Sequence, residues 1–171
     1  YPLVLEVRHS SWNQREIFQA LAEQGVGFCN IDQPVIGRSI EPSDRTTSPI
    51  GYVRLHGRNY EHWFTAEDRP EERYNYLYSM EELAPWAERI RNISQRAEVT
   101  YVITNNHFHG KAVANALQLI SLLRGQPVSV PETLITRYPE LQEIATPAGP
   151  PPAPRQADLL FEAPAANKKN V

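Results

Sequence analysis

Short runs of β-branched and aliphatic residues alternate along the chain with segments of helical periodicity, and this order constrains the fold more than any other feature. The strand-like runs occupy residues 3–7, 26–32, 52–58 and 99–106. A helical segment follows the first, third and fourth runs, whereas a long loop rich in proline and glycine follows the second. Strands separated by helices are typical of parallel β/α units, so we expect an α/β fold with a parallel sheet.

Helix signals flank the first two helical segments. Ser11 or Asn13 can cap the first helix, and Gly25 is well placed to end it. Ser79 begins a capping box with Glu82, three residues on, before the second helix. The local sequence therefore predicts where both helices begin.

The third helix is predicted over residues 110–123 and ends before Gly125. Its apolar residues recur at helical spacing and are expected on the inner face: Val113, Ala116, Leu117, Ile120 and Leu123. Residues 131–144 then predict one or two short helical turns, divided at Pro139.

The third strand-like run, residues 52–58, has the sequence Y-V-R-L-H-G-R. In a strand, Val53 and Leu55 point to one face while Arg54 and His56 point to the other. An arginine and a histidine on one face are unusual for a strand that only fills a core. We therefore expect this strand to carry part of a site.

Composition narrows the function classes. The 171 residues are 41% hydrophobic and 22% charged, which is ordinary for a soluble globular protein. A net charge of -3 provides no global basic field to hold nucleic acid. Cys29 is the only cysteine, which excludes an internal disulfide and a cysteine zinc site and favours a reducing compartment, the cytoplasm. No apolar run approaches the about 20 residues of a membrane span, so no membrane partner is expected.

Four motifs occur in order along the chain: E-V-R-H-S-S-W, Y-V-R-L-H-G-R, Y-x-Y-x-Y-S-x-x-E-L-x-x-W-A and N-N-x-x-x-G-x-A-x-x-N-A. Together they resemble the YecE-like family, a domain of unknown function with a (β/α)₈ TIM-barrel fold. The resemblance covers residues 3–124, and the ordered set is far more specific than any one motif. It implies a fold and a candidate site without a reaction.

In that family the four motifs belong to the last four strands of the barrel, and the motifs of the first four strands are absent here. The resemblance therefore implies that residues 1–145 are the C-terminal half of a TIM barrel. This bacterial fragment would have the missing N-terminal half as its partner, and open sheet edges predict poor solubility or self-association without it. Six of the 15 prolines lie in residues 146–171, which predicts a disordered tail.

TIM-barrel enzymes place their sites at the carboxyl ends of the strands. The resemblance puts these residues there: Glu6, Arg8, His9, Asp32, Arg54, His56, Arg58, Asn105 and Asn106. One interpretation is an internal ion-pair network that holds the barrel layers together, because an unpaired buried charge is costly. The other interpretation is a ligand site, and both stay open at this point.

If the residues at the carboxyl ends of the strands form a ligand site, that site would bind an anion or a phosphate group. Arg54 and Arg58 supply the planar fork that suits phosphate oxygens, and Gly110 lets backbone N–H groups approach an anion closely. The predicted ligand-binding residues are Arg8, Asp32, Arg54, Arg58, Asn105, Asn106 and Gly110. The candidate general acids or bases are Glu6, His9 and His56.

Metal and cofactor motifs are weak or missing. His107 and His109 lie two residues apart, but H-x-H alone is not specific, and no H-E-x-x-H helix is present. The chain also lacks a Gly-rich phosphate loop and a G-x-S-x-G elbow. We therefore predict neither a metal nor a cofactor.

Residues 156–161 have the sequence Q-A-D-L-L-F, which resembles the short motif by which bacterial replication and repair proteins bind the sliding clamp. In an extended peptide, Leu159, Leu160 and Phe161 would fill an apolar pocket, and Gln156 would hydrogen-bond at its edge. The alternatives are a helical turn that docks back onto the barrel, or a chance match.

Two function classes therefore stay open. The first is an enzyme that acts on a phosphate-bearing substrate, nucleic acid included. The second is a non-catalytic binding module that the tail recruits to DNA, with an ion-pair network at the strand ends.

Overall fold

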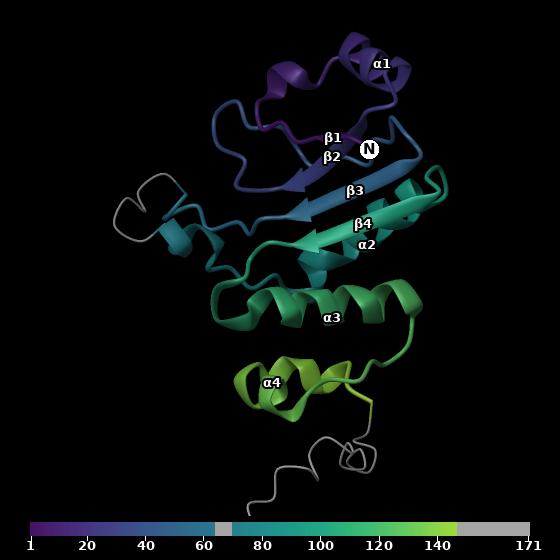
Figure 1. Cartoon of the computed structure of the whole chain (residues 1–171). Helices are drawn as coiled ribbons and strands as arrows, with labels where there is room; N and C mark the ends of the chain where they lie inside the picture. The colour runs from purple at the N-terminus through teal and green to yellow at the C-terminus, as the bar shows by residue number, and fades with distance from the viewer. Residues whose placement is uncertain (64–69, 147–171) are drawn as a thin grey trace, which may run out of the picture.

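The computed structural model describes residues 1–63 and 70–146. Within them, four strands form one parallel sheet in sequential order (Figure 1). The strands are β1 (Val4–Leu5), β2 (Gly27–Asp32), β3 (Ile50–Leu55) and β4 (Val99–Thr104). The predicted α/β fold with a parallel sheet is confirmed.

Helices follow β1, β3 and β4 and flank the sheet, whereas a loop connects β2 to β3. The α-helices are α1 (Arg15–Glu23), α2 (Met80–Ser94), α3 (Lys111–Arg124) and α4 (Glu132–Arg137). Short 3₁₀ helices are η1 (Ser10–Trp12), η2 (Pro70–Tyr74), η3 (Phe108–Gly110) and η4 (Pro139–Glu143). In Figure 1, α2 lies behind β3 and β4, while α1 flanks the β1 side and α3 and α4 flank the β4 side. Across the two described ranges, no helix combines the length and apolar character needed to cross a membrane.

The apolar core lies mainly between the sheet and α2. Along β3, Val53 and Leu55 are buried, while Arg54 is partly exposed on the other face. The two buried side chains pack with Trp86 and Ile90 of α2 in one apolar cluster. The predicted alternation of this strand is therefore confirmed, and its helix-covered face is the apolar one.

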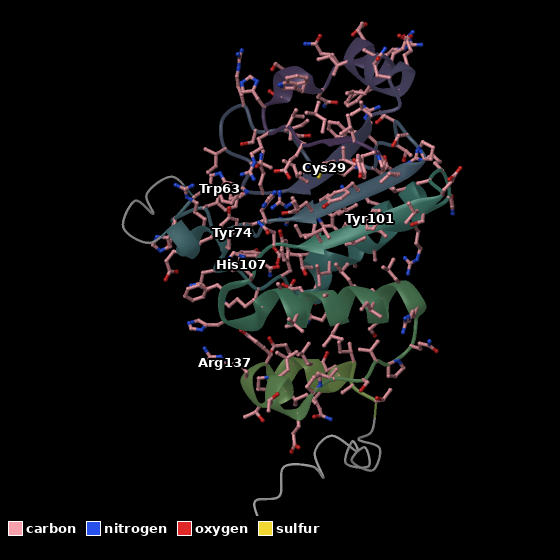
Figure 2. The ribbon with its side chains drawn as sticks, viewed as in Figure 1. Cys29, Trp63, Tyr74, Tyr101, His107 and Arg137 are labelled. Carbon is pink, nitrogen blue, oxygen red and sulfur yellow. The ribbon has the colours of Figure 1, made fainter. Side chains whose placement is uncertain are left out.

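The opposite face of β4 is open. Val99, Tyr101 and Ile103 are 41%, 50% and 37% exposed, although all three are large and apolar. Figure 2 shows Tyr101 on the side of the sheet that faces the viewer, opposite α2. Its ring lies 6.1 Å from that of Tyr52 on β3, measured between centroids. Parallel sheets normally have both faces covered, so this uncovered apolar face needs an explanation.

Two further apolar clusters lie outside the core between the sheet and α2. Phe28 of β2 meets Phe18 of α1 edge-on, with ring centroids 5.1 Å apart. On the other side, Ala114 of α3 packs with Tyr138 and Leu141 from the last helical turns. The short helices after α3 therefore pack against α3.

Three predicted helix ends are confirmed. Ser79 accepts a hydrogen bond from the backbone N–H of Glu82, whose side chain accepts one from the N–H of Ser79. Gly125 ends α3 with a φ of 65°, and Gly25, with a φ of 66°, follows the last residues of α1. These left-handed conformations are ones that glycine adopts without strain.

The predicted N-cap of the first helix is wrong. Gln14 occupies that position and makes no side-chain capping hydrogen bond. Ser11 lies inside η1, which His9 caps by accepting a hydrogen bond from the Ser11 N–H, and Asn13 follows the end of η1. The segment first forms a separate turn, so α1 begins later than the capping residues suggest.

The predicted inner face of α3 is wrong at one position. Val113 is 53% exposed, whereas Asn115 and Gln118 are buried. The Asn115 side chain accepts from the backbone N–H of Tyr78 at 3.0 Å and donates to its carbonyl at 2.9 Å. A buried amide with such partners is stable, and a pattern of apolar residues alone cannot reveal it.

Candidate functional site

The carboxyl ends of the four strands point to one edge of the sheet, on the left in Figure 1. Each strand brings a polar residue to this edge: Glu6 after β1, Asp32 at the end of β2, His56 after β3 and Asn105 after β4. The strand β3 begins earlier and ends earlier than residues 52–58, so Arg58 lies in the loop that follows it.

Glu6 is the centre of one cluster at this edge. Its Oε2 accepts a hydrogen bond from Arg54 Nη1 at 2.8 Å, and its Oε1 lies 3.0 Å from Arg8 Nη2 and 3.1 Å from His56 Nε2. The hydrogen bond from His56, helped by Arg54, lowers the pKa of Glu6 to about 2, although partial burial opposes the shift. Glu6 is therefore an ionised carboxylate held by three donors.

His56 is fully buried, and its hydrogen bonds fix its tautomer. The Asn105 side-chain nitrogen lies 3.1 Å from His56 Nδ1, and the Asn105 oxygen faces Arg54 at 3.5 Å. An amide N–H that donates to Nδ1 leaves Nε2 as the ring nitrogen whose proton points to Glu6. Asn105 and Glu6 thus hold the imidazole from both sides.

Asp32, which is fully buried, is the centre of a second cluster. Its two oxygens accept from Arg58 Nε at 2.8 Å and Nη2 at 2.7 Å, in the paired geometry typical of arginine and carboxylate. The Tyr78 hydroxyl at 3.0 Å and the Trp86 indole N–H also donate to Asp32. The hydrogen bond with Asp32 raises the pKa of Arg58 further above its ordinary value. Arg58 therefore has a structural partner inside the protein.

Three predicted site residues lie away from both clusters. His9 is exposed and caps η1. Asn106 is fully buried and donates to the Tyr76 carbonyl and to Asn115. Gly110, with a φ of 86°, is the residue before α3. The predicted clamp-binding residues, 156–161, lie outside the described residues.

A pocket of about 450 Å³ opens beside Arg8, the ion-pair partner of Glu6. It is lined by Arg8, His9, Gln33, Ile36, Arg38, Ser39, Trp63, Arg73 and Tyr74. These residues follow β1, β2 and β3, so three consecutive strands each contribute a wall. Figure 2 shows Trp63 and Tyr74 at the edge where the strands end, with His107 beside them.

Sequence reasoning missed Gln33, Arg38 and Arg73 as members of this pocket. Their position along the chain could have identified them, because all three lie in segments that follow the carboxyl end of a strand. The long loop after β2 gives no periodic pattern, so its path could not be predicted. Hydrogen bonds to the segment after β1 determine that path: Ser10 N–H to the Arg38 carbonyl at 2.8 Å and Ile40 N–H to the Arg8 carbonyl at 2.8 Å.

The described residues give little support for a metal site or for a reactive cysteine. Residues 1–63 and 70–146 contain no group of three or more His, Cys, Asp or Glu side chains arranged to hold a metal. Cys29 is buried, and its burial, followed by the charge of Glu6, raises the pKa of the thiol to about 12. A thiol with so high a pKa is a poor nucleophile.

Comparison with known protein families identifies the family of this chain. The family described as "Protein of unknown function DUF72" matches residues 1–140. The chain belongs to the DUF72 family. Its similarity to the YecE-like family, inferred from the four motifs, is consistent with this membership.

Solved DUF72 structures share the fold. A DUF72 family protein from Thermotoga maritima is 42% identical, with a TM-score of 0.68, and the match covers 72% of this chain and 46% of that one. A DUF72 family protein from Enterococcus faecalis is 29% identical, with a TM-score of 0.66, and the match covers 76% of this chain and 49% of that one. The chain thus spans about half the length of these DUF72 structures. No curated protein matches it.

Proposed function

We propose that this DUF72 chain binds a phosphate-bearing ligand at the carboxyl edge of its sheet and acts on it as an enzyme. The observation that carries the proposal is a pocket lined by three arginines, one of which, Arg8, also pairs with the ionised Glu6. Among the described residues that line it, none is an Asp or a Glu. Phosphate oxygens pair well with arginine, and a carboxylate next to them is a candidate base.

Arg8 connects the two parts of the proposed site. It lines the pocket, and its Nη2 also lies 3.0 Å from Glu6 and 3.3 Å from His56. An anion that attracts Arg8 would remove one of the three donors that hold Glu6. A carboxylate that loses a charged donor binds a proton more readily, which would make Glu6 a better proton acceptor.

The candidate acid/base residues differ in their access to a ligand. His9 lines the pocket and is exposed, so it can contact a ligand directly. His56 is fully buried, so we assign it the role of orienting Glu6. Arg54 and Asn105 would hold this pair in place, while Arg58 would act through its buried partner.

The test combines binding and turnover. Titration calorimetry with inorganic phosphate should show at least ten-fold weaker binding to Arg8→Ala, while Arg96→Ala, at an exposed ion pair near the amino ends of the strands, should bind like wild type. With an aryl phosphate as probe, Glu6→Gln should lose turnover and keep binding. Equal phosphate binding by wild type and Arg8→Ala would contradict the proposal.

We also propose that the sheet is half of a (β/α)₈ barrel, that the missing N-terminal half completes it, and that residues 146–171 form a separate tail. Sequential parallel strands and a length about half that of the DUF72 structures support this. The exposed face of β4 would then lie inside the closed barrel. The single cysteine agrees with a cytoplasmic location.

The alternative function is a non-catalytic binding module that residues 156–161 recruit to the sliding clamp. The observation in its favour is the Q-A-D-L-L-F sequence. A peptide of residues 152–171 should bind a bacterial sliding clamp with about micromolar affinity. Gln156→Ala and Phe161→Ala peptides should lose that binding, and a wild-type peptide that fails to bind would remove this alternative.

A further inference from the structure

We propose that the pocket binds a phosphate monoester of a flat ring, with the phosphate among Arg8, Arg38 and Arg73 and the ring against Trp63 and Tyr74. This inference rests on the proposed phosphate-binding function and names the class of ligand. It also places the ligand among residues that follow β1, β2 and β3, of which only Arg8 belongs to the set predicted from sequence.

The cationic wall of the pocket is held in place before any ligand arrives. The backbone of Arg8 and that of Arg38 are linked through an antiparallel bridge between His9 and Ser39. Gln33 adds a hydrogen bond from its side-chain nitrogen to the Arg8 carbonyl at 3.3 Å. A site whose backbone is fixed loses less conformational entropy when a ligand binds.

The charges of this wall favour a doubly charged group. Within residues 1–63 and 70–146, Arg38 has no carboxylate at ion-pair distance, and Arg73 Nε is buried without a hydrogen-bond partner. A buried guanidinium N–H without an acceptor is costly. A phosphate monoester carries up to two charges and three terminal oxygens, so it can satisfy several arginines at once.

The aromatic wall favours a ring next to that phosphate. Trp63 and Tyr74 each lie 6.4 Å from the His56 ring, between centroids, and Tyr74 lies 5.1 Å from the ring of His107. The guanidinium carbon of Arg8 is 5.7 Å from the Trp63 ring centre, so cation and aromatic surface are adjacent. Aromatic side chains in such an array bind flat rings by stacking.

Gln33 gives the ring site a polar contact. The residue is only 4% exposed, lines the pocket, and its Oε1 is buried without a hydrogen-bond partner. Such an acceptor suits an amino or amide N–H at the edge of a heterocycle. The volume of about 450 Å³ suits one small molecule, so we infer a monomeric ligand of nucleotide size.

Titration calorimetry on the 171-residue chain tests the inference with four probes: inorganic phosphate, phenyl phosphate, adenosine monophosphate and adenosine. Both phosphate esters should bind about ten-fold more tightly than inorganic phosphate, since stacking of one ring contributes about that much. Adenosine should bind more weakly than its monophosphate.

Variants separate the two halves of the pocket. Trp63→Leu should remove the advantage of the esters and leave inorganic phosphate unchanged, while Trp63→Phe, which keeps a ring, should retain part of it. Arg38→Ala should weaken all three phosphates about ten-fold, and Arg96→Ala, at the opposite edge of the sheet, should weaken none.

Each possible failure has a separate meaning. Esters that bind no better than inorganic phosphate to wild type would overturn the ring assignment and leave the proposed phosphate binding intact. Adenosine that binds as tightly as its monophosphate would overturn the phosphate assignment. If no phosphate binds to wild type, both this inference and the proposed function are wrong.

Discussion

Asp32 joins three segments of the chain through its two oxygens. It ends β2, and it accepts hydrogen bonds from Arg58 in the loop after β3 and from Trp86 in α2. The carboxylate is fully buried, whereas the guanidinium of Arg58 is partly exposed and also lies 3.3 Å from Glu82 Oε1. The pair therefore contributes to holding the loop after β3 at the site.

Asp32→Asn should lower the free energy of unfolding by about 3 kcal/mol, because it removes the buried partner of Arg58 and weakens the acceptor of Tyr78 and Trp86, while only the partly exposed Glu82 remains beside the guanidinium. Urea denaturation followed by circular dichroism measures this change. Asp44→Asn is the matched control, since Asp44 is partly exposed and its ion pair with Arg96 should contribute less than about 1 kcal/mol. Equal losses in the two variants would show that burial of the Asp32 pair does not matter.

Glu6 makes stability depend on pH. Its pKa is lowered from 4.5 to about 2, so the folded state binds its proton less readily than the unfolded state does. The stabilisation is complete above about pH 4.5 and is lost as the pH falls toward 2. The shift corresponds to roughly 3 kcal/mol at most.

Urea denaturation at several pH values between 2 and 6 checks this prediction. Wild type should lose stability on acidification more steeply than Glu6→Gln, which has no proton to bind at this position. Parallel curves for the two proteins would mean that Glu6 has the same proton affinity in both states.

At the scale of elements, β3 and α2 approach each other closely at Gly51. A Cβ at this position would collide with Ile93 of α2 and come within 2.8 Å of Thr100 Oγ1 on β4. Only a residue without a side chain allows this contact, so Gly51 sets the distance between the helix and the sheet.

Gly51→Ala should therefore destabilise the protein by about 1–3 kcal/mol through overpacking. Thermal or urea unfolding measures the change. Ile93→Ala provides room for the new methyl group, so the double variant should lose less stability than the sum of the two single variants. Strictly additive losses would indicate that the two side chains do not meet.

The elements differ in how far sequence could predict them. The capping box at Ser79 and the glycines after α1 and α3 were predictable, because each depends on two or three neighbouring residues. The start of α1 was not, because η1 uses His9 and Ser11 for a turn of its own. The exposed side of α3 was missed because buried Asn115 is stabilised by the backbone of Tyr78, far away in the chain.

The candidate site was predictable to a similar extent. Glu6, Arg54, His56 and Asn105 follow or end strands of one parallel sheet, and parallel strands bring their carboxyl ends to a common edge. The sequence could not show whether Arg58 pairs with Asp32 or binds a ligand. It also could not predict the position of Arg38, which depends on backbone hydrogen bonds across a loop with no periodic pattern.

At the scale of the whole molecule, the open face of β4 should make the isolated chain self-associate. Val99, Tyr101 and Ile103 form an apolar surface on the face opposite α2. Sedimentation velocity at increasing concentration should show larger species for wild type, and Tyr101→Glu should reduce them. Val113→Glu changes an apolar residue of similar exposure on α3 and should leave the association unchanged. A monomer at all concentrations would contradict the prediction.

The pocket is contiguous along the chain. All its lining residues fall between Arg8 and Tyr74, in the first half of the described sequence, while the uncovered surface of β4 comes later. The residues that line the pocket and the strand whose face is uncovered therefore belong to different segments of the sequence. A duplication or a fusion of the gene that keeps residues 1–107 would carry the pocket and β4 together, and the exposed strand could then accept a different complement.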